Sequence, residues 1–320
     1  NFRVLPFAFP TQRSIIDSST PQVQPMALLD KALDSVDAYV AHFSARPLPV
    51  LRRTVVELAE MQGEMDKLSG KRIAATVLRD PLMTIRLLTY LQTHRRQAQN
   101  HDITTIDRAI MMMGLEPFFR IFAELPTVED TLAAHPKALL GVLKVIGRAR
   151  RAAHFARDWA IVRHDLDVDE ITVATLLLET ADIVCWICAP ALTAEVYELQ
   201  RRDRNLRSVV AQRAVFGATA KEIQIALVHT WKLPELLIDL MNENKADNPR
   251  VRNVLLAADF AHLDQAVREG KPAVLDARSE YARDVQKFAR KIVAEEEGTG
   301  PAEEPRGFFE GLLDAVRKGR

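Results

Sequence analysis

Apolar residues recur at helical spacing along most of the chain from residue 26 onward. One example is the set Leu51, Val55, Leu58 and Ala59. Because positions i, i+4, i+7 and i+8 share one side of a 3.6-residue helix, this set forms a single apolar stripe. Comparable stretches cover residues 137–162, 170–187, 193–201, 218–231, 234–242, 249–267 and 278–294. No strand-like alternation competes with them, so the sequence predicts an all-α fold.

Capping residues and turn formers mark several helix ends. Ser69 is suited to cap a helix over 71–78. Asp80 and Pro81 pair a capping carboxylate with a residue that tolerates the first helical position, where no N–H is needed. Gly114 is suited to end the helix before it. These signals predict a succession of short helices in the first third of the chain.

Both ends of the chain differ in composition from this helical region. Residues 1–25 are rich in proline, serine and threonine, which predicts an irregular arm. Residues 26–268 form the expected helical domain, and residues 269–294 add one further helix. Residues 295–320 combine an acidic linker containing glycine and proline with a short amphipathic segment.

The amphipathic segment has one apolar stripe, which consists of Phe308, Phe309, Leu312, Leu313 and Val316. Isolated helices this short are marginal in water, which favours a segment that caps the main domain or frays. The alternative is a tethered helix that docks on a partner protein through this stripe.

The composition is that of a folded globular protein. Of the 320 residues, 48% are hydrophobic and 27% are charged, and the length allows one large or two modest domains. The 43 basic side chains balance the 43 acidic ones, so no global field attracts nucleic acid or anionic lipid. Any such binding requires a local patch.

No membrane span or export signal is expected. Glu179 and Asp182 interrupt the longest apolar stretch, over residues 173–192. The apolar residues 4–9 are too few for a signal peptide and contain Pro6. The two cysteines, Cys185 and Cys188, cannot build a disulfide framework. We therefore expect a cytoplasmic protein.

Few motifs suggest chemistry. Cys185 and Cys188 form a CxxC, but it lies late in an apolar helix with no second cysteine pair for zinc, which favours two core cysteines. The eight histidines are scattered and form no HExxH pair. Phosphate-binding glycine loops and a GxSxG elbow are also absent from the sequence. Metal, nucleotide-loop and serine chemistry thus lack a motif.

Arginine is concentrated in two places. One group surrounds Asp203 and consists of Arg201, Arg202, Arg204 and Arg207. The other lies on one long helix and consists of Arg148, Arg150, Arg151 and Arg157. Arg150, His154 and Arg157 share a helix face, and such a face can hold phosphates. Because no aromatic residues are interleaved for base stacking, we favour a solvated or salt-bridged face and do not expect nucleic-acid binding.

Several segments together resemble the HDOD domain, the HD-related output domain of bacterial signalling proteins. They are Leu-Pro-Val-Leu at 48–51, Ser-Gly-Lys-Arg-Ile-Ala at 69–74, the Arg-Asp-Pro segment at 78–88, the Ala-Ile-(x)3-Gly-Leu segment at 106–116, and Trp-Lys-Leu-Pro at 231–234. The resemblance covers residues 48–263. It implies an all-helical HDOD-type bundle related to HD-domain phosphohydrolases, with an N-terminal helical subdomain.

The resemblance also implies where a metal site would lie. HD phosphohydrolases use a histidine from one helix, a His-Asp doublet from the next, and a distal aspartate to hold a metal that activates water. In this chain Arg148 falls at the first position, Glu179 and Thr180 at the doublet, and Asp259 at the distal acid. Both imidazoles are missing, so we expect no bound metal, no other cofactor and no catalytic residue. Arg148 and Glu179 are interpreted as an ion pair that replaces the cation in a degenerate pocket.

These features favour a non-catalytic regulatory module of bacterial signalling that binds protein partners. The tail is one expected contact, and a nucleotide is a candidate ligand of the degenerate pocket. The alternative is a divergent HD-type phosphohydrolase acting on a nucleotide or cyclic dinucleotide, with Glu179, Asp182 and Asp259 as substitute metal ligands. A third hypothesis is an arginine-mediated nucleic-acid adaptor, whose binding would depend steeply on salt.

Overall fold

The structure is a computed structural model that describes residues 28–268, apart from 66–67, 95–105, 123, 166, 204–205, 241 and 246. Regular structure in these residues is helical, with one isolated parallel bridge between Val50 and Thr127. The all-α prediction is therefore confirmed. The predicted arm over 1–25, the helix over 269–294 and the tail with its Phe308 to Val316 stripe lie outside the described residues.

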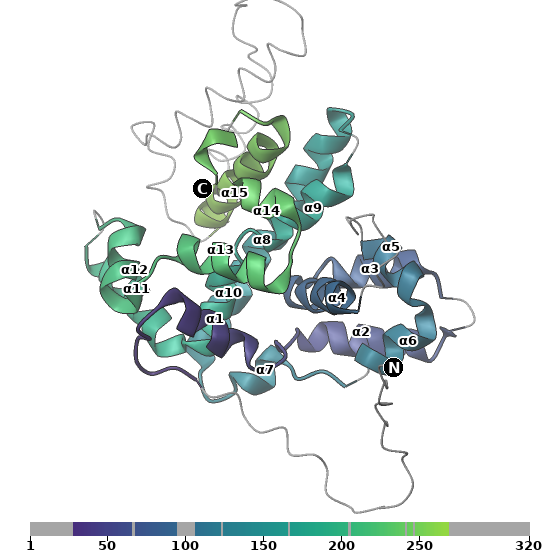
Figure 1. The fold of residues 1–320 in the computed structure, drawn as a ribbon, viewed down its shortest axis with the longest axis horizontal. Coiled ribbons are helices and arrows are strands. Elements are labelled where there is room, and N and C mark those ends of the chain that lie inside the picture. The colour runs from purple at the N-terminus through teal and green to yellow at the C-terminus, as the bar shows by residue number, and fades with distance from the viewer. Residues whose placement is uncertain are drawn as a thin grey trace, which may run out of the picture.

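The helices are short except for α8 and α15 (Figure 1). The first seven are α1 (Val36–Ser44), α2 (Arg52–Gln62), α3 (Gly70–Val77), α4 (Pro81–Thr93), α5 (Ile106–Met113), α6 (Leu115–Phe122) and α7 (Val128–Thr131). The remainder are α8 (Pro136–Val162), α9 (Val168–Leu177), α10 (Thr180–Cys188), α11 (Pro190–Arg202), α12 (Ser208–Phe216), α13 (Ala220–Trp231), α14 (Glu235–Leu240), the 3-10 turn η2 (Glu243–Lys245) and α15 (Pro249–Arg268).

The helices fall into two groups. The blue helices α2 to α6 lie on one side of the molecule, and α10 to α13 lie on the other (Figure 1). Helix α1 crosses to the second group and packs against α13. Two hydrogen bonds fix it there: the Tyr39 hydroxyl donates to the Phe216 carbonyl at 2.9 Å, and Trp231 Nε1 donates to Ser44 Oγ at 2.9 Å. The predicted N-terminal subdomain is thus α2 to α6, without α1.

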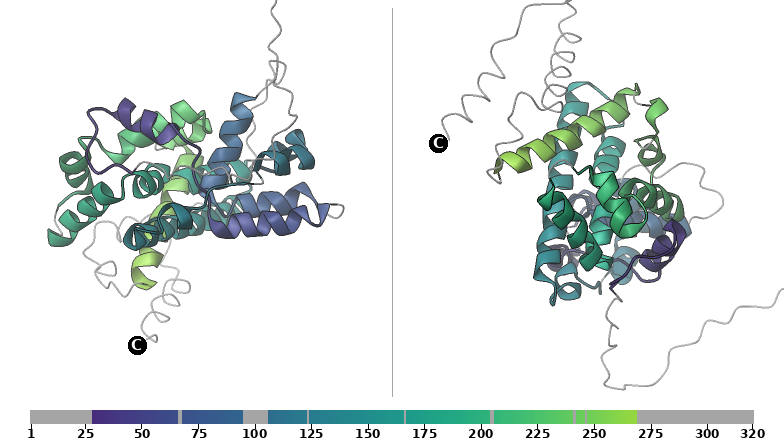
Figure 2. Two further views of the ribbon diagram at one scale, coloured as in Figure 1. Left: turned by 90° about the horizontal axis from the view of Figure 1, so that it is seen from below. Right: turned by 90° about the vertical axis from the view of Figure 1, so that its left-hand side faces the viewer.

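Helix α8 is the central element of the second group. Its 27 residues pack against α9, α10 and α15, and Figure 2 (right) shows the yellow-green α15 running across the teal α8. Small residues on α8 allow this close packing. They are Ala149, Ala152, Ala153, Ala156 and Ala160, all buried. Gly141 is the extreme case, since a Cβ there would lie 2.6 Å from Trp186 Cε2.

Several predicted helix ends are confirmed. Ser69 Oγ accepts a hydrogen bond from the backbone N–H of Arg72, so this serine caps α3. Asp80 caps α4 by accepting from Leu82 N and Met83 N. Gly114 has a φ of 81°, a left-handed conformation that suits glycine, and it separates α5 from α6.

The single helix predicted over 170–187 is wrong, because the structure divides it into α9 and α10. In a continuous helix the N–H of Ala181 would donate to the carbonyl of Leu177. Instead, Gln224 Oε1 accepts from Ala181 N at 2.7 Å, and Gln224 Nε2 donates to the Leu177 carbonyl at 3.0 Å. One buried glutamine from α13 thus satisfies both groups of the missing helical bond. The break leaves Glu179 at the start of α10.

The pattern of apolar residues predicted no helix over residues 208–216, where the structure has α12. Val209 and Val210 are exposed, which obscures the apolar stripe made by Ala211, Val215 and Phe216.

One stretch, Val168–Cys188, is long and apolar enough to cross a membrane by length and composition, but 83% of its best window is buried inside the protein. It spans α9 and α10 with the break between them, so it is a core segment of a folded domain.

Candidate functional site

The centre of the candidate site is an ion pair between α8 and the start of α10. Arg148 Nε donates to Glu179 Oε1 at 2.7 Å and to Oε2 at 3.0 Å. The Arg148 side chain is 10% exposed and that of Glu179 is 12% exposed. The pair predicted for these two positions is therefore present, and it is largely removed from solvent.

Helix α15 adds a third member to this centre. His262 Nε2 lies 2.9 Å from Glu179 Oε1, and the His262 side chain is 49% exposed. Glu179 thus joins α8 to α15, two helices that are far apart in sequence. Sequence reasoning missed His262, although its position three residues after Asp259 places both on one face of α15 and was the available signal.

The charges in this centre stabilise one another. Burial alone would raise the pKa of Glu179, but hydrogen bonds from His262 and Arg148, together with their positive charges, hold that pKa below its ordinary value. Burial opposes the charge on Arg148, and the Glu179 carboxylate nevertheless raises the pKa of that guanidinium. Both groups are therefore ionised at neutral pH.

The other two predicted site residues play different parts. Thr180 is fully buried, and its hydroxyl donates to the Leu177 carbonyl at 2.7 Å, inside the break between α9 and α10. It stabilises the backbone rather than turning toward the ion pair. Asp259 lies half-buried on α15, one helical turn before His262.

A second carboxylate, Asp182, lies three residues after Glu179 on α10. Burial is the main cause that raises its pKa to about 6, and the negative charge of Glu179 adds to this effect. Arg148 and His262 oppose the shift without cancelling it. Sequence reasoning included Asp182 only as a substitute metal ligand, because nothing in its spacing reveals its surroundings in the fold.

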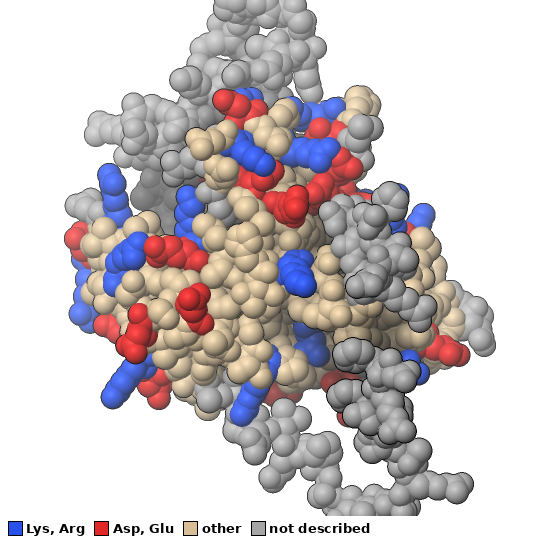
Figure 3. Space-filling model, in the orientation of Figure 1, with Lys and Arg blue, Asp and Glu red and all other residues tan. Residues whose placement is uncertain are grey.

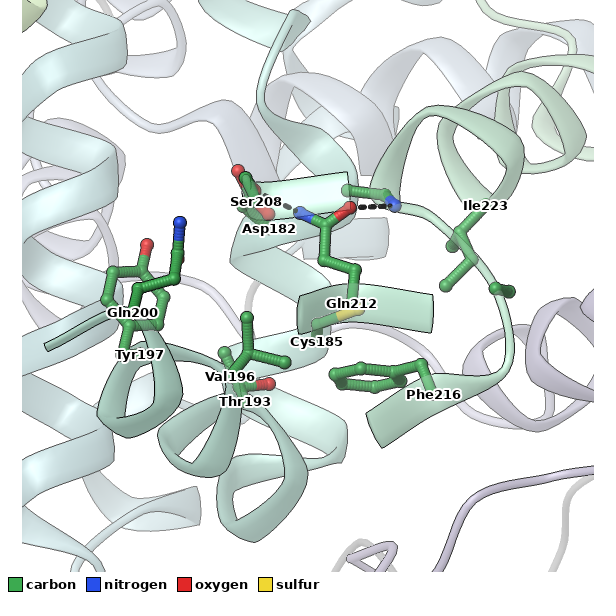
Figure 4. Close-up of a pocket in the computed structure, with 12 residues that line it drawn as sticks. Asp182, Cys185, Thr193, Val196, Tyr197, Gln200, Ser208, Gln212, Phe216 and Ile223 are labelled. Carbon is green, nitrogen blue, oxygen red and sulfur yellow. Dashed lines mark hydrogen bonds between the residues drawn. The ribbon is translucent and has the colours of Figure 1, made fainter. Parts of the chain in front are cut away.

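Asp182 borders a cavity of about 100 Å³ that is lined by residues of α10, α11, α12 and α13. Figure 4 shows Gln212 reaching across it, with Nε2 donating to Ser208 Oγ at 3.0 Å and Oε1 accepting from Ala220 N at 2.9 Å. Small-molecule sites are usually about 300–1,000 Å³. This cavity has room for a few water molecules, and none of the residues predicted for the degenerate pocket lines it.

The CxxC cysteines and the arginines at the end of α11 have structural roles. Cys185 and Cys188 are buried in α10, and burial raises the pKa of both thiols, that of Cys188 to about 12, which disfavours the reactive thiolate. Arg201 Nη2 and Arg202 Nε pair with Glu198 at 2.8 and 3.0 Å, as the salt-bridged interpretation of that cluster predicts.

The residues at the expected metal position do not fit a divalent cation. A guanidinium has no lone pair to donate and carries a fixed positive charge, and Arg148 occupies the Glu179 carboxylate. Thr180 uses its hydroxyl within the helix break. Among the described residues, no group of three or more histidine, cysteine, aspartate or glutamate side chains is arranged to hold a metal ion.

The fold and this centre define an all-helical domain with an arginine–glutamate pair, largely removed from solvent, between α8 and α10. Residues 48–246 match the family model of the HDOD domain, which is more than half of the chain. The chain therefore belongs to the HDOD family, as the motifs predicted. Among curated proteins, none matches it.

Solved structures share this fold at low sequence identity. A virulence factor from Campylobacter jejuni subsp. jejuni is 18% identical, with a TM-score of 0.55 over 83% of this chain and 93% of that chain. A fragment of the MmoQ response regulator from Methylococcus capsulatus str. Bath is also 18% identical, with a TM-score of 0.50 over 81% of this chain and 93% of that chain. These likenesses extend the fold match beyond the residues of the family model.

Proposed function

We propose that this protein is a non-catalytic regulatory module of bacterial signalling that acts in the cytoplasm by binding protein partners. The observation that supports the proposal is the buried pair between Arg148 and Glu179, two residues that the family resemblance assigns to metal-ligand positions of HD phosphohydrolases. A fixed cation at that position repels a metal ion and occupies the carboxylate that would bind it.

The same pair suits a structural role. Removing one partner of a buried ion pair leaves an uncompensated charge, so the pair holds its two elements in one arrangement. Here the elements are α8 and α10, and His262 adds α15. The centre would then keep three helices in a fixed relation and present their outer surfaces to a partner. The name of MmoQ, a response regulator with this fold, is in keeping with such a role.

Metal content and turnover test the proposal. The purified full chain is expected to contain far less than one equivalent of manganese, iron, zinc or magnesium, and to hydrolyse neither bis(p-nitrophenyl) phosphate nor cyclic dinucleotides. A triple variant, Arg148→His with Glu179→His and Thr180→Asp, restores the side chains that HD phosphohydrolases use and should raise the metal content above that of the wild type.

The divergent-enzyme alternative predicts a different result. If Glu179, Asp182 and Asp259 act as substitute ligands, the wild type retains stoichiometric metal and turns over a phosphodiester. That turnover should disappear in Asp259→Ala and persist in Asp158→Ala, a matched loss of an exposed carboxylate on α8. Such an outcome would replace the regulatory proposal with the enzyme.

A further inference from the structure

A large groove lies between the two groups of helices, away from the ion-pair centre. Its walls are α3 and α5 on one side and α8 and α9 on the other, and its volume is about 990 Å³. In Figure 1, α3 and α5 lie to the right of α8 and α9. Small residues from both walls, including Ala74, Gly147 and Ala153, line it and leave space for an occupant. This volume lies at the upper end of the range typical of small-molecule sites.

Basic side chains dominate the polar lining of the groove. They are Lys71, Arg79, Arg150, Arg151, His154 and Arg157. Two carboxylates, Asp107 and Asp169, also line it, so positive charge remains in excess. The basic residues come from segments separated by about 70 residues in sequence, and both walls contribute. Two distant parts of the chain thus place like charges around one space.

Several of these cations have no ion-pair partner in the part of the chain that the structure describes. Lys71, Arg150 and Arg157 are exposed and form no ion pair or hydrogen bond with another described residue. Arg79 pairs only distantly, with its Nη1 3.6 Å from Glu57 Oε2. This differs from the surface outside the groove, where Arg201 and Arg202 share Glu198. Figure 3 shows acidic and basic side chains interspersed over the face that it draws.

The cations also disfavour one another. Partial burial and the nearby positive charges of Arg53 and Arg79 lower the pKa of Arg150, and these effects outweigh those of the nearby carboxylates. Such mutual repulsion is relieved when an anion enters the space between the guanidinium groups. The groove is therefore arranged for an anionic occupant.

We propose that this groove binds a small molecule that carries two or more phosphate groups. Arginine binds phosphate oxygens through paired N–H groups, and several arginines around one space match the charge density of adjacent phosphates. No phenylalanine, tyrosine or tryptophan is among the described lining residues, so recognition rests on the phosphates rather than on base stacking. The proposal is independent of whether the Glu179 centre is catalytic.

Titration with inorganic tripolyphosphate tests the site. Calorimetry on the full chain at about 50 mM salt is expected to show one equivalent bound. Arg150→Gln combined with Arg157→Gln should weaken binding at least tenfold, since each loses a charge-assisted contact. The matched control, Lys137→Gln with Arg207→Gln, removes the same charge at exposed positions outside the groove and should change affinity less than twofold.

Three results would overturn the proposal. One is an equal loss of affinity in the groove variant and its control, which indicates a diffuse charge effect. The second is an acidic peptide, such as residues 295–304 of this chain, that binds more tightly than tripolyphosphate. The third is tighter binding of a 20-nucleotide DNA. If the double variant melts early, Lys71→Gln on the opposite wall replaces it, with an expected loss of at least threefold.

Discussion

Asp80 and Glu179 are carboxylates buried in different halves of the molecule, and their surroundings are opposite in kind. Asp80 accepts hydrogen bonds from Leu51 N and Thr54 Oγ1, each at 2.8 Å, and also caps α4. Its partners are neutral, and burial raises its pKa. Glu179 has two basic partners, Arg148 and His262, and its pKa is lowered.

The difference separates a local structural role from a long-range one. Asp80 connects Leu51, the residue before α2, to the first turn of α4. The sequence separation between Asp80 and Leu51 is 29 residues, and the backbone N–H groups that Asp80 accepts from are those of helix starts. Glu179 joins α8 to α15 through its ion pair with Arg148 and its contact with His262. Burying an ion pair costs desolvation free energy. Neutral hydrogen-bond donors, as around Asp80, would be enough to stabilise the fold. The proposal of a replaced metal site rests on this pair together with the family resemblance, which assigns the metal to these positions.

The first and largest prediction concerns removal of one charged partner. Arg148→Met should lower the free energy of unfolding by about 3–5 kcal/mol, because Glu179 then remains buried without its arginine partner. Urea denaturation measures this change. The double variant Arg148→Met with Glu179→Gln should lose less than the sum of the two single variants.

A matched control for this prediction is Arg201→Met, which removes an arginine from an exposed pair with Glu198. It is expected to leave the urea midpoint unchanged. Equal effects of the Arg148 and Arg201 substitutions would mean that the buried pair does not hold the helices together.

The second prediction concerns the neutral centre. Asp80→Ala should cost about 3 kcal/mol, more than the roughly 0.5–2 kcal/mol of a simple N-cap, because the donors Leu51 N and Thr54 Oγ1 also lose their acceptor. Ser69→Ala is the comparison, since it removes a cap that has no such additional donors. A similar loss in both variants would show that the contacts of Asp80 to α2 contribute nothing.

These two centres also show what the sequence reveals. The Asp80 cap was predictable, because an aspartate directly before proline is a local signal. The Arg148–Glu179 pair was predictable only through the resemblance to a family. The contact of His262 with Glu179 and the raised pKa of Asp182 were not predicted, since both depend on how distant helices pack. The break between α9 and α10 was hidden for the same reason, because it is made by Gln224, 43 residues after Ala181.

The third prediction uses the pH dependence of stability. Because the folded pKa of Asp182 is about 6 and its ordinary value is 3.8, the native state holds this proton more tightly than the unfolded chain. Wild-type stability therefore loses a contribution as the pH rises from about 4 to about 6. In Asp182→Asn that loss is absent. The free energy of unfolding of the variant should therefore rise relative to that of the wild type by roughly 2–3 kcal/mol across this interval, at about 1.4 kcal/mol per unit of pKa.

Chemical denaturation at several pH values measures this difference, and Asp158→Asn on the surface of α8 is the control. Comparing variant with wild type cancels the opposite contribution of Glu179, whose lowered pKa stabilises the fold above about 4.5 and is lost on acidification. If the free energy of unfolding changes with pH in the same way for Asp182→Asn and the wild type, Asp182 is hydrated in solution.

The last and smallest expected effect on stability concerns the tail over residues 295–320. The tail consists of an acidic linker and a short amphipathic segment. A segment of this composition adds little to the stability of a folded core, unlike the residues around Asp80 and Glu179. Deleting it should leave the helical circular dichroism and the melting temperature nearly unchanged, while weakening the capture of at least one protein partner. The double substitution Phe308→Ser with Leu312→Ser should weaken binding of the same partner to the full-length chain, because it disrupts the apolar stripe that the deletion removes.

A truncated protein that unfolds or precipitates would instead assign the tail to the core, and partner binding would then have to be sought on the outer faces of α8 and α15.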